Sequence, residues 1–212
     1  RKPQVTYGDT LTGDLTRRDF TVNAMALRLP DLELVDPCGG LADLAAGPQP
    51  LVYFAMGSSG NRDLVLHVLA GLGRADCQVL APVRTHLREE DLGTLPRNVH
   101  VTDWLPAHQL GDAVDLAITH GGEGTVQTSC VQGWPFIGIP LQFEQRFNVQ
   151  RCAAFGSARL VSRREARRTD WAELVRQALA DDGMRSRARR MAGLMEGLDG
   201  PGRAAEAICE LL

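Results

Sequence analysis

Short apolar runs alternate with amphipathic stretches along the chain from residue 51 onwards. The runs are four to six residues long, and the first is fully apolar, which is typical of strands buried on both faces of a parallel sheet. They cover residues 51–56, 78–81, 99–102, 116–119 and 136–139. Helical patterns separate several of them and cover residues 62–72, 106–112, 124–132 and 144–155. This alternation predicts an α/β fold with a doubly wound, Rossmann-like parallel sheet.

The two ends of the chain depart from this alternation. The pattern from Thr169 to Leu212 predicts a helical tail, divided by glycines at positions 183, 197, 200 and 202. Near the start, an apolar-rich run at 20–27 and a strand-like alternation at 32–36 indicate a short β-rich segment, with a turn at Pro30-Asp31. Residues 45–50 have the small, proline-containing composition of a linker. We therefore expect two units, at 1–48 and 49–212.

Composition narrows the function classes. The net charge is −3, so nothing in the overall charge favours nucleic acid or membrane partners. The arginines of the tail alternate with acidic residues, which predicts a solvated helix face.

The cysteines and the apolar runs bear on the cellular location. Five cysteines without CxxC spacing argue against a disulfide framework or a zinc site and fit a reducing cytoplasm. No apolar run approaches the roughly 20 residues that span a bilayer, and no signal peptide pattern is present. The first residue is Arg rather than Met, which suggests a fragment.

A glycine-rich loop is the strongest chemical signal. His120-Gly121-Gly122-Glu123-Gly124-Thr125 lies between a predicted strand and a predicted helix. Such a loop lets backbone N–H groups approach an anion and directs the positive end of the helix dipole at it. Thr125 is placed where an N-cap hydroxyl would lie, and His120 can donate a further hydrogen bond. The alternative is a tight turn that only caps the helix, with His120 a hydrogen-bonded core residue.

Other candidate residues follow the carboxyl ends of neighbouring predicted strands, where a doubly wound sheet binds ligands. Gly57-Ser58-Ser59-Gly60 is a second anion-ready loop, and two such loops suit a diphosphate. Trp104 can stack on a base, and the polar side chains at 144, 145 and 148 can bind sugar hydroxyls. Each alone also fits a structural role, such as packing for Trp104 or an acidic helix start for Glu144. Together they favour a nucleotide-sugar site.

Several motifs resemble the C-terminal domain of GT-B UDP-glycosyltransferases, with the bacterial natural-product and macrolide-type members most similar in texture. They lie in the family's order within residues 50–162, at 99–106, 115–125, 133–135 and 140–148. The resemblance implies a donor diphosphate site formed by Ser58, His120, Gly121, Gly122, Gly124 and Thr125. It places Trp104, Leu105 and Thr128 at the base and ribose, and Glu144 and Gln145 at the donor sugar. The implied ligands are a UDP- or TDP-sugar and a small-molecule acceptor, without a cofactor or metal.

Two positions depart from the family pattern. Ala107 stands directly after Pro106, where the family often has Gln. Thr128 stands where the family usually has a Glu that binds the ribose. Ribose and base selectivity therefore stay open, and so does the choice between UDP and TDP.

The first 48 residues carry a different resemblance. Arg17 and Arg18 can clamp phosphates, and Asp19 and Asn23 can hydrogen-bond a ribose or a base. With the segment 34–44 they resemble part of the head domain of bacterial tRNA nucleotidyltransferases, the CCA-adding enzymes and related poly(A) polymerases. That family binds two Mg²⁺ ions through carboxylates of an earlier strand, which residues 1–6 do not supply. Mg²⁺ is expected only if this part were active, and tRNA is not expected as a partner.

Three hypotheses follow. The first is the donor-binding domain of a hexosyltransferase, for which we assign no catalytic residue because inverting GT-B enzymes take their histidine base from an N-terminal acceptor domain. Such a chain binds donor but transfers sugar poorly alone. The second is a fragment of a nucleotidyltransferase that acts on tRNA 3′ ends. The third is a non-catalytic chimera of the two, natural or engineered, joined near residues 45–50.

Overall fold

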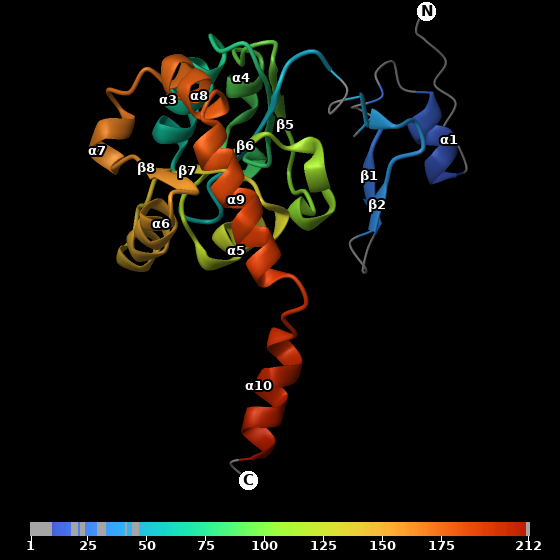
Figure 1. Ribbon diagram of the computed structural model, residues 1–212. Coiled ribbons are helices and arrows are strands. Elements are labelled where there is room, and N and C mark those ends of the chain that lie inside the picture. Colours follow the sequence, from blue (N-terminus) through green and yellow to red (C-terminus); the bar gives the residue numbers. More distant parts are fainter. Residues whose placement is uncertain are drawn as a thin grey trace, which may run out of the picture.

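A six-stranded parallel sheet forms the centre of the structure, a computed structural model that describes residues 10–17, 21, 24–28, 33–40, 42–43 and 47–210. The strand order is β5-β4-β3-β6-β7-β8 (Figure 1). The strands are β3 (Leu51–Ala55), β4 (Gln78–Ala81), β5 (Val99–Val101), β6 (Leu116–Thr119), β7 (Phe136–Gly138) and β8 (Ala158–Leu160). The order reverses between β3 and β6, so the ligand crevice of a doubly wound sheet lies at the carboxyl ends of these two strands.

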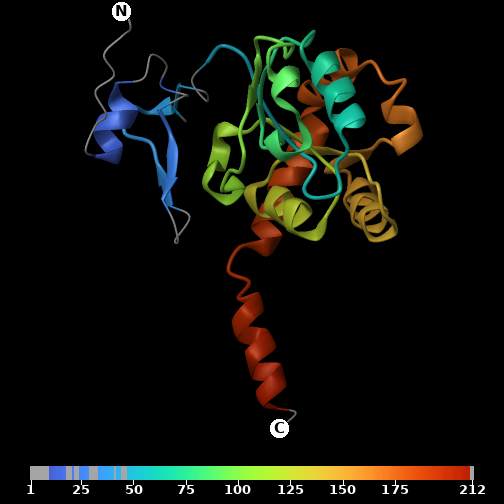
Figure 2. The same cartoon turned by 180° about the vertical axis from the view of Figure 1, so that it is seen from behind.

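Helices cover both faces of this sheet (Figures 1 and 2). On one face the core includes residues of α3 (Arg62–Leu72), α7 (Arg163–Ala166), α8 (Trp171–Leu179) and the start of α9 (Asp182–Met195). On the other it includes residues of α5 (Glu123–Gln132) and α6 (Phe143–Phe155), with the short 3₁₀ turns η3 (Ala107–Gln109) and η4 (Gly111–Ala113). These two layers leave the central strands buried on both faces.

The sequence of β3 shows why this arrangement forms. Val52 and Phe54 point into the core on the α3 face, whereas Leu51, Tyr53 and Ala55 point into the core on the α5 face. Successive side chains of a strand point to opposite faces, so a run without polar residues is stable only between two apolar layers. The predicted α/β class and parallel sheet are confirmed, as is the helical tail.

Some predicted boundaries were wrong, for local reasons. The region predicted as one helix at 106–112 contains the two 3₁₀ turns instead, because Gly111, the first residue of η4, adopts a positive φ of 52°. Gly183 lies inside α9 and does not divide it, since the Asp181 side chain accepts from Met184 N and starts the helix before that glycine. Gly200-Pro201-Gly202 begins α10 (Gly200–Cys209), where Asp199 is the N-cap and proline is favoured in the first turn.

Four short elements within residues 49–212 were not predicted. They are β8, α7 and α4 (Glu89–Leu92), together with the 3₁₀ turn η2 (Arg84–His86). Each has three or four residues, which is too short for a periodic pattern to stand out. They are held by tertiary contacts and capping, as at Ser162, which accepts from Glu165 N and caps α7.

The N-terminal unit consists of α1 (Leu11–Thr16) and a separate two-stranded antiparallel sheet of β1 (Ala26–Arg28) and β2 (Glu33–Val35). The strand predicted at 32–36 is thereby confirmed, while the turn at Pro30-Asp31 lies outside the described residues. The backbone N–H of Leu34 donates to Gln109 Oε1 at 3.2 Å, and Met25 packs against the core on the α5 face. The small unit therefore rests on the η3 side of the larger domain.

The end of the predicted linker is fixed to the sheet. Gln49 Nε2 donates to Asp76 Oδ1 and Gln78 Nε2 donates to Gln49 Oε1, both at 2.5 Å. Gln78 N also donates to Pro50 O at 2.9 Å. Residues 49 and 50 are thus hydrogen-bonded to residues of the larger domain.

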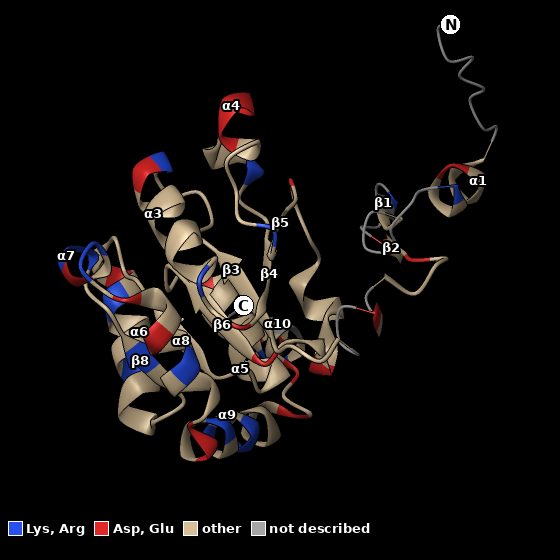
Figure 3. Cartoon of the chain, turned by 90° about the horizontal axis from the view of Figure 1, so that it is seen from above, with Lys and Arg blue, Asp and Glu red and all other residues tan. Residues whose placement is uncertain are grey.

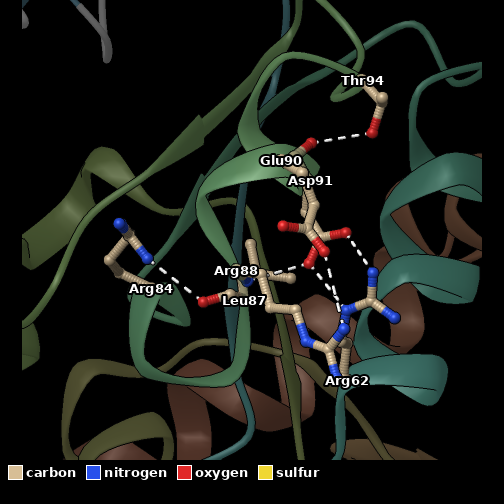
Figure 4. A network of polar contacts seen from close by, with 7 residues as sticks. All are labelled: Arg62, Arg84, Leu87, Arg88, Glu90, Asp91 and Thr94. Atoms are coloured by element: carbon tan, nitrogen blue, oxygen red, sulfur yellow. Dashed lines mark hydrogen bonds and ion pairs between the residues drawn. The ribbon is translucent and has the colours of Figure 1, made fainter.

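A buried ion pair joins α3 to α4 (Figure 4). Arg62 donates to Asp91 through Nε at 2.8 Å and through Nη2 at 2.5 Å, and Arg88 N donates to the same carboxylate at 2.9 Å. The Asp91 side chain is only 6% exposed. Its hydrogen bond with Arg62 lowers the pKa of Asp91 to about 2. A buried carboxylate of this kind is stabilising only while its partners are in place.

We expect Asp91→Asn to lower the melting temperature by several degrees at pH 7, because Arg62 loses its charged partner. The folded pKa of about 2 lies below the ordinary value of 3.8. The ionised carboxylate therefore stabilises the fold above about pH 4, and this contribution is lost as the pH falls towards 2. Thermal denaturation at pH 7 and pH 3 tests this: the gap between wild type and variant should narrow at pH 3. Asp63→Asn, on the exposed face of α3, is the control, and equal melting temperatures for Asp91→Asn and wild type at pH 7 would contradict the prediction.

Basic and acidic residues both occur along α9 in the helical tail (Figure 3). Arg159 pairs with Asp181 at 2.8 Å, Arg176 with Glu173 at 2.6 Å and Arg185 with Asp182 at 2.9 Å. The arginine-rich tail is thus a mixed, solvated face, as predicted. In the described part of the chain, no helix combines the length and apolar character that crossing a membrane requires.

Candidate functional site

The loop between β6 and α5, residues 120–125, is closely packed and is called the cradle below. Gly121 has a positive φ of 84°, and a Cβ there would lie 2.5 Å from Val149 Cγ2 and 2.8 Å from the backbone oxygen of Gln145. Gly122 is the N-cap of α5. The N–H groups of Glu123, Gly124 and Thr125 therefore open the helix without partners inside it. A helix start with three such donors and a positive dipole end favours the binding of an anion.

The threonines of this loop hold its shape. Thr125 was predicted at the N-cap, which is wrong: it lies in the first turn of α5, and Gly122 is the cap. Its hydroxyl donates to Gly122 O at 2.9 Å and accepts from Thr119 Oγ1 at 2.7 Å. Gly121 N in turn donates to Thr119 Oγ1 at 3.3 Å. The helix starts earlier than the side-chain pattern suggested because a glycine can take the extended cap conformation as readily as Ser or Thr.

His120 lies between the two glycine-rich loops. Its side chain is buried at 7% exposed. A Cβ on Gly57 would lie 2.5 Å from His120 Cε1, and a Cβ on Gly122 would overlap His120 Nε2. His120 Nδ1 is buried without a hydrogen-bond partner. The imidazole is therefore enclosed by backbone from both loops.

The second loop follows β3 and meets α6. Ser58 is exposed, as a ligand contact requires. Ser59 Oγ accepts from Gln145 Nε2 at 3.0 Å, and Gly57 O lies 2.7 Å from His86 Nε2. The loops after β3 and β6 thus lie side by side at the carboxyl edge of the sheet, as the sequence predicted.

Burial lowers the pKa of His120 below its ordinary value of 6.5, although Ala55 O and Glu144 favour the charged form. Burial acts in the same direction on the pKa of His100. Each neutral imidazole contributes stability that is present above about pH 6.5 and lost as the pH falls through its lowered folded pKa. We expect the melting temperature of His120→Asn to fall less than that of wild type between pH 7.5 and pH 5. Thermal denaturation at both pH values measures this, and an equal fall in both proteins would refute it.

The residues assigned to the base and ribose differ in accessibility. Trp104 is 49% exposed, whereas Leu105 is 9% exposed and packs in the core on the α5 face. Leu105 can therefore reach a ligand only through its backbone. Thr128 is half-buried, and its hydroxyl donates to Gly124 O at 2.8 Å. Thr128 thus forms an internal helix bond where the family's Glu would reach outward.

The two residues assigned to the donor sugar also differ in accessibility. Glu144 is exposed in the first turn of α6. Gln145 is 2% exposed, and its Oε1 accepts from Leu141 N at 2.9 Å and from Gln142 N at 3.1 Å. Gln145 caps α6, so a contact with a sugar requires its Nε2 to exchange the bond to Ser59. Asn148 Nδ2 donates to Gly121 O at 3.1 Å and supports the cradle.

The nucleotidyltransferase-like residues are only partly described. Arg17 ends α1 and pairs with Asp14. Arg18, Asp19 and Asn23 lie outside the described residues. The nucleotide contacts assigned to this segment therefore stay predictions.

Sequence reasoning missed His86, Ser59 and the capping function of Gln145. His86 touches the Gly57 loop from η2, which lies in no motif. The sequence signal for Ser59 was its place beside Ser58 in the same glycine loop. Only the tertiary structure shows that Ser59 is bound to α6.

The fold is that of the Rossmann-like C-terminal domain of GT-B glycosyltransferases. Residues 66–211 match the family described as Erythromycin biosynthesis protein CIII-like, C-terminal domain. The chain belongs to this family. Residues 1–48 match a second family, the Poly A polymerase head domain.

Known proteins support this assignment. The PGL/p-HBAD biosynthesis glycosyltransferase of Mycobacterium tuberculosis (strain ATCC 25177 / H37Ra) is 30% identical over 146 residues, which is 68% of this chain and 33% of the relative. The crystal structure of CalG4, the calicheamicin glycosyltransferase, matches with a TM-score of 0.66 at 25% identity, over 76% of this chain and 43% of that one. Glycosyltransferase VinC in complex with DTDP matches with a TM-score of 0.63 at 20% identity, over 82% of this chain and 41% of that one.

The chain spans 33% of the length of this mycobacterial relative. The comparisons thus establish a glycosyltransferase C-terminal domain. This domain corresponds to only a part of each relative.

Proposed function

We propose that residues 49–212 bind the nucleoside diphosphate of a UDP- or TDP-sugar, as the donor domain of a glycosyltransferase that moves a hexose to a small-molecule acceptor. The observation that carries this proposal is the pair of glycine loops that enclose His120 at the switch point of the sheet. Two adjacent loops that present backbone donors suit two phosphates. The DTDP bound to VinC supports a pyrimidine nucleotide.

Within this site, Ser58, His120, Gly121, Gly122, Gly124 and Thr125 bind the diphosphate. Trp104 stacks on the base, with the Leu105 backbone and Thr128 near the ribose, and Glu144 and Gln145 lie at the sugar. Backbone N–H groups and a helix N-terminus can neutralise the diphosphate charge. Donor binding therefore needs no metal or other cofactor.

We also propose that these 212 residues bind donor but transfer sugar poorly by themselves, since the matches cover only 33% of the mycobacterial relative and 43% of CalG4. In this view the chain is a chimera of two units, 1–48 and 49–212. The match of residues 1–48 to a polymerase head domain keeps a second function open, a fragment acting on tRNA 3′ ends. Incorporation of CMP or AMP into tRNA by the purified chain would favour that function over ours.

A thermal-shift panel with UDP, TDP, UDP-glucose, CTP and ATP tests the proposal. We expect stabilisation by the pyrimidine diphosphates and by UDP-glucose, because ligands that bind only the folded state raise the melting temperature. No shift with any of these three would overturn the proposed function. Efficient glycosylation of an aglycone by the chain alone would overturn only the proposal that it is incomplete.

Gly124→Ala separates a ligand effect from a folding effect. No atom lies within 4 Å of a Cβ at this position, and alanine in a helix is more stable than glycine by about 0.5–1 kcal/mol. We expect an unchanged or higher melting temperature but at least about tenfold weaker UDP binding, equivalent to about 1.4 kcal/mol, because the methyl group stands where the phosphate approaches. Isothermal titration calorimetry measures this affinity. Gly193→Ala in α9, also without a neighbour within 4 Å of the new Cβ, is the matched control. Wild-type affinity in Gly124→Ala would show that the phosphate does not bind at this helix end.

A further inference from the structure

A small pocket lies where the N-terminal unit meets the loop after β5. Its volume is about 200 Å³, and it is lined on one side by residues 102–106 and on the other by Met25, Ala26 and Leu34. Pockets for drug-sized ligands have volumes of about 300–1,000 Å³. This pocket therefore fits a single ring rather than a whole nucleotide sugar.

The walls of the pocket suit a flat ring with polar edges. Trp104 provides an aromatic surface that is 49% exposed, and Met25 and Leu34 provide a thioether and an aliphatic side chain opposite. Thioether and aliphatic groups pack well on the face of an aromatic ring. Among the lining residues, Thr102 has a buried hydroxyl without a hydrogen-bond partner, and Asp103 is an exposed acceptor. Such a combination matches a pyrimidine base, which has two flat faces and a polar rim.

The position of the pocket fits the rest of the site. The strand order places β5 two strands from β3 and three from β6. With neighbouring strands about 4.8 Å apart, the pocket is on the order of 10–15 Å from the two glycine loops. An extended nucleoside diphosphate has a comparable length from the far edge of its base to its terminal phosphate, so one nucleotide can reach both places.

The part of the N-terminal unit that lines the pocket also contacts the larger domain elsewhere. Leu34 N donates to Gln109 Oε1 at 3.2 Å, and Met25 packs against the core on the α5 face. Both contacts lie on the side of η3, directly after the loop that carries Trp104. The wall is thus held beside Trp104 by one polar and one apolar contact.

We infer that the β1–β2 unit forms the second wall of the base pocket, so that the donor base binds between Trp104 on one side and Met25 and Leu34 on the other. This inference rests on the proposed function. It gives the N-terminal unit a binding function that does not depend on nucleotidyl transfer: it encloses the base and contributes to its selection. The diphosphate cradle needs no contact with it.

The test compares a ligand that has a base with one that lacks it. In the full chain, Met25→Ala should weaken UDP binding about five- to tenfold in calorimetry, whereas binding of inorganic pyrophosphate should be unchanged. Leu11→Ala, on the exposed face of α1 in the same unit, is the matched control and should bind both ligands like wild type. Unchanged or tighter UDP binding by Met25→Ala, or an equal loss for both ligands, would overturn the inference.

A second measurement on the wild-type chain does not depend on the folding of a variant. Trp104 is the exposed tryptophan, since Trp134 is 3% and Trp171 0% exposed. UDP should therefore protect Trp104 fluorescence from quenching by iodide, and pyrophosphate should not. Equal protection by the two ligands would show that the base does not bind in this pocket.

The two tests distinguish failure of the inference from failure of the proposed function. If wild type binds neither UDP nor pyrophosphate, the proposed function itself fails. If UDP binds but Met25→Ala does not change its affinity, only the inference fails.

Discussion

Replacement of Gly121 by alanine is expected to lower the free energy of unfolding by about 2–5 kcal/mol. Two independent costs add up to this value. The φ of 84° at Gly121 is a left-handed conformation that costs an L-residue about 1–2 kcal/mol. The new Cβ would lie 2.8 Å from the backbone oxygen of Gln145 and 2.5 Å from Val149 Cγ2, and such overpacking costs about 1–3 kcal/mol.

A matched variant separates the two costs. Gly111 also has a positive φ, of 52°, but a methyl group at Gly111 would have no neighbouring atom within 4 Å. Gly111→Ala should therefore show the conformational cost alone. Urea denaturation of both variants measures the difference. If Gly121→Ala is no less stable than Gly111→Ala, the close packing of the cradle against α6 is not what holds this loop.

Replacement of His120 by alanine is expected to weaken UDP binding about tenfold to hundredfold. A hydrogen bond to a charged group contributes about 1.5–3 kcal/mol, and each 1.4 kcal/mol is a factor of ten in affinity. The imidazole is enclosed by both glycine loops and has a polar atom without a partner. Its removal therefore takes away a donor and also loosens the two loops that present backbone N–H groups.

The control for this variant is His67→Ala, because His67 is exposed on α3. Calorimetry with UDP compares both variants with wild type, and circular dichroism verifies that each is folded. His120→Asn retains a hydrogen-bond donor and should recover part of the affinity. A folded His120→Ala protein with wild-type affinity would show that His120 is only a packing residue of the loop.

The sheet and its main helices could be predicted because each carries a pattern of its own. The helix at 62–72 and the strands at 78–81 and 116–119 were predicted at the bounds that the structure shows. A strand buried on both faces has to be apolar throughout, and a helix on the sheet has to be apolar along one side. Both requirements are local enough to read from consecutive residues.

The shape of the loop at 120–125 was predictable because its backbone conformation requires glycine. The hydrogen-bond partners of polar side chains were less predictable. The glycines of the loop at 120–125 marked the cradle, since few other residues allow such a turn. The cap of α5 was misplaced at Thr125, and the bonds by which Gln145 caps α6 and holds Ser59 were not predicted. Both side chains satisfy polar groups that become neighbours only after folding.

The sequence by itself determined the fold class, the order of strands and helices and the family of the larger unit. These depend on apolar periodicity and on glycine positions, which are properties of short stretches. Only the tertiary structure decided that Gly57 and Gly122 enclose one imidazole and that the β1–β2 unit lies against the Trp104 loop. Both arrangements join residues from distant parts of the chain, and such contacts depend on shape and burial that no local pattern encodes.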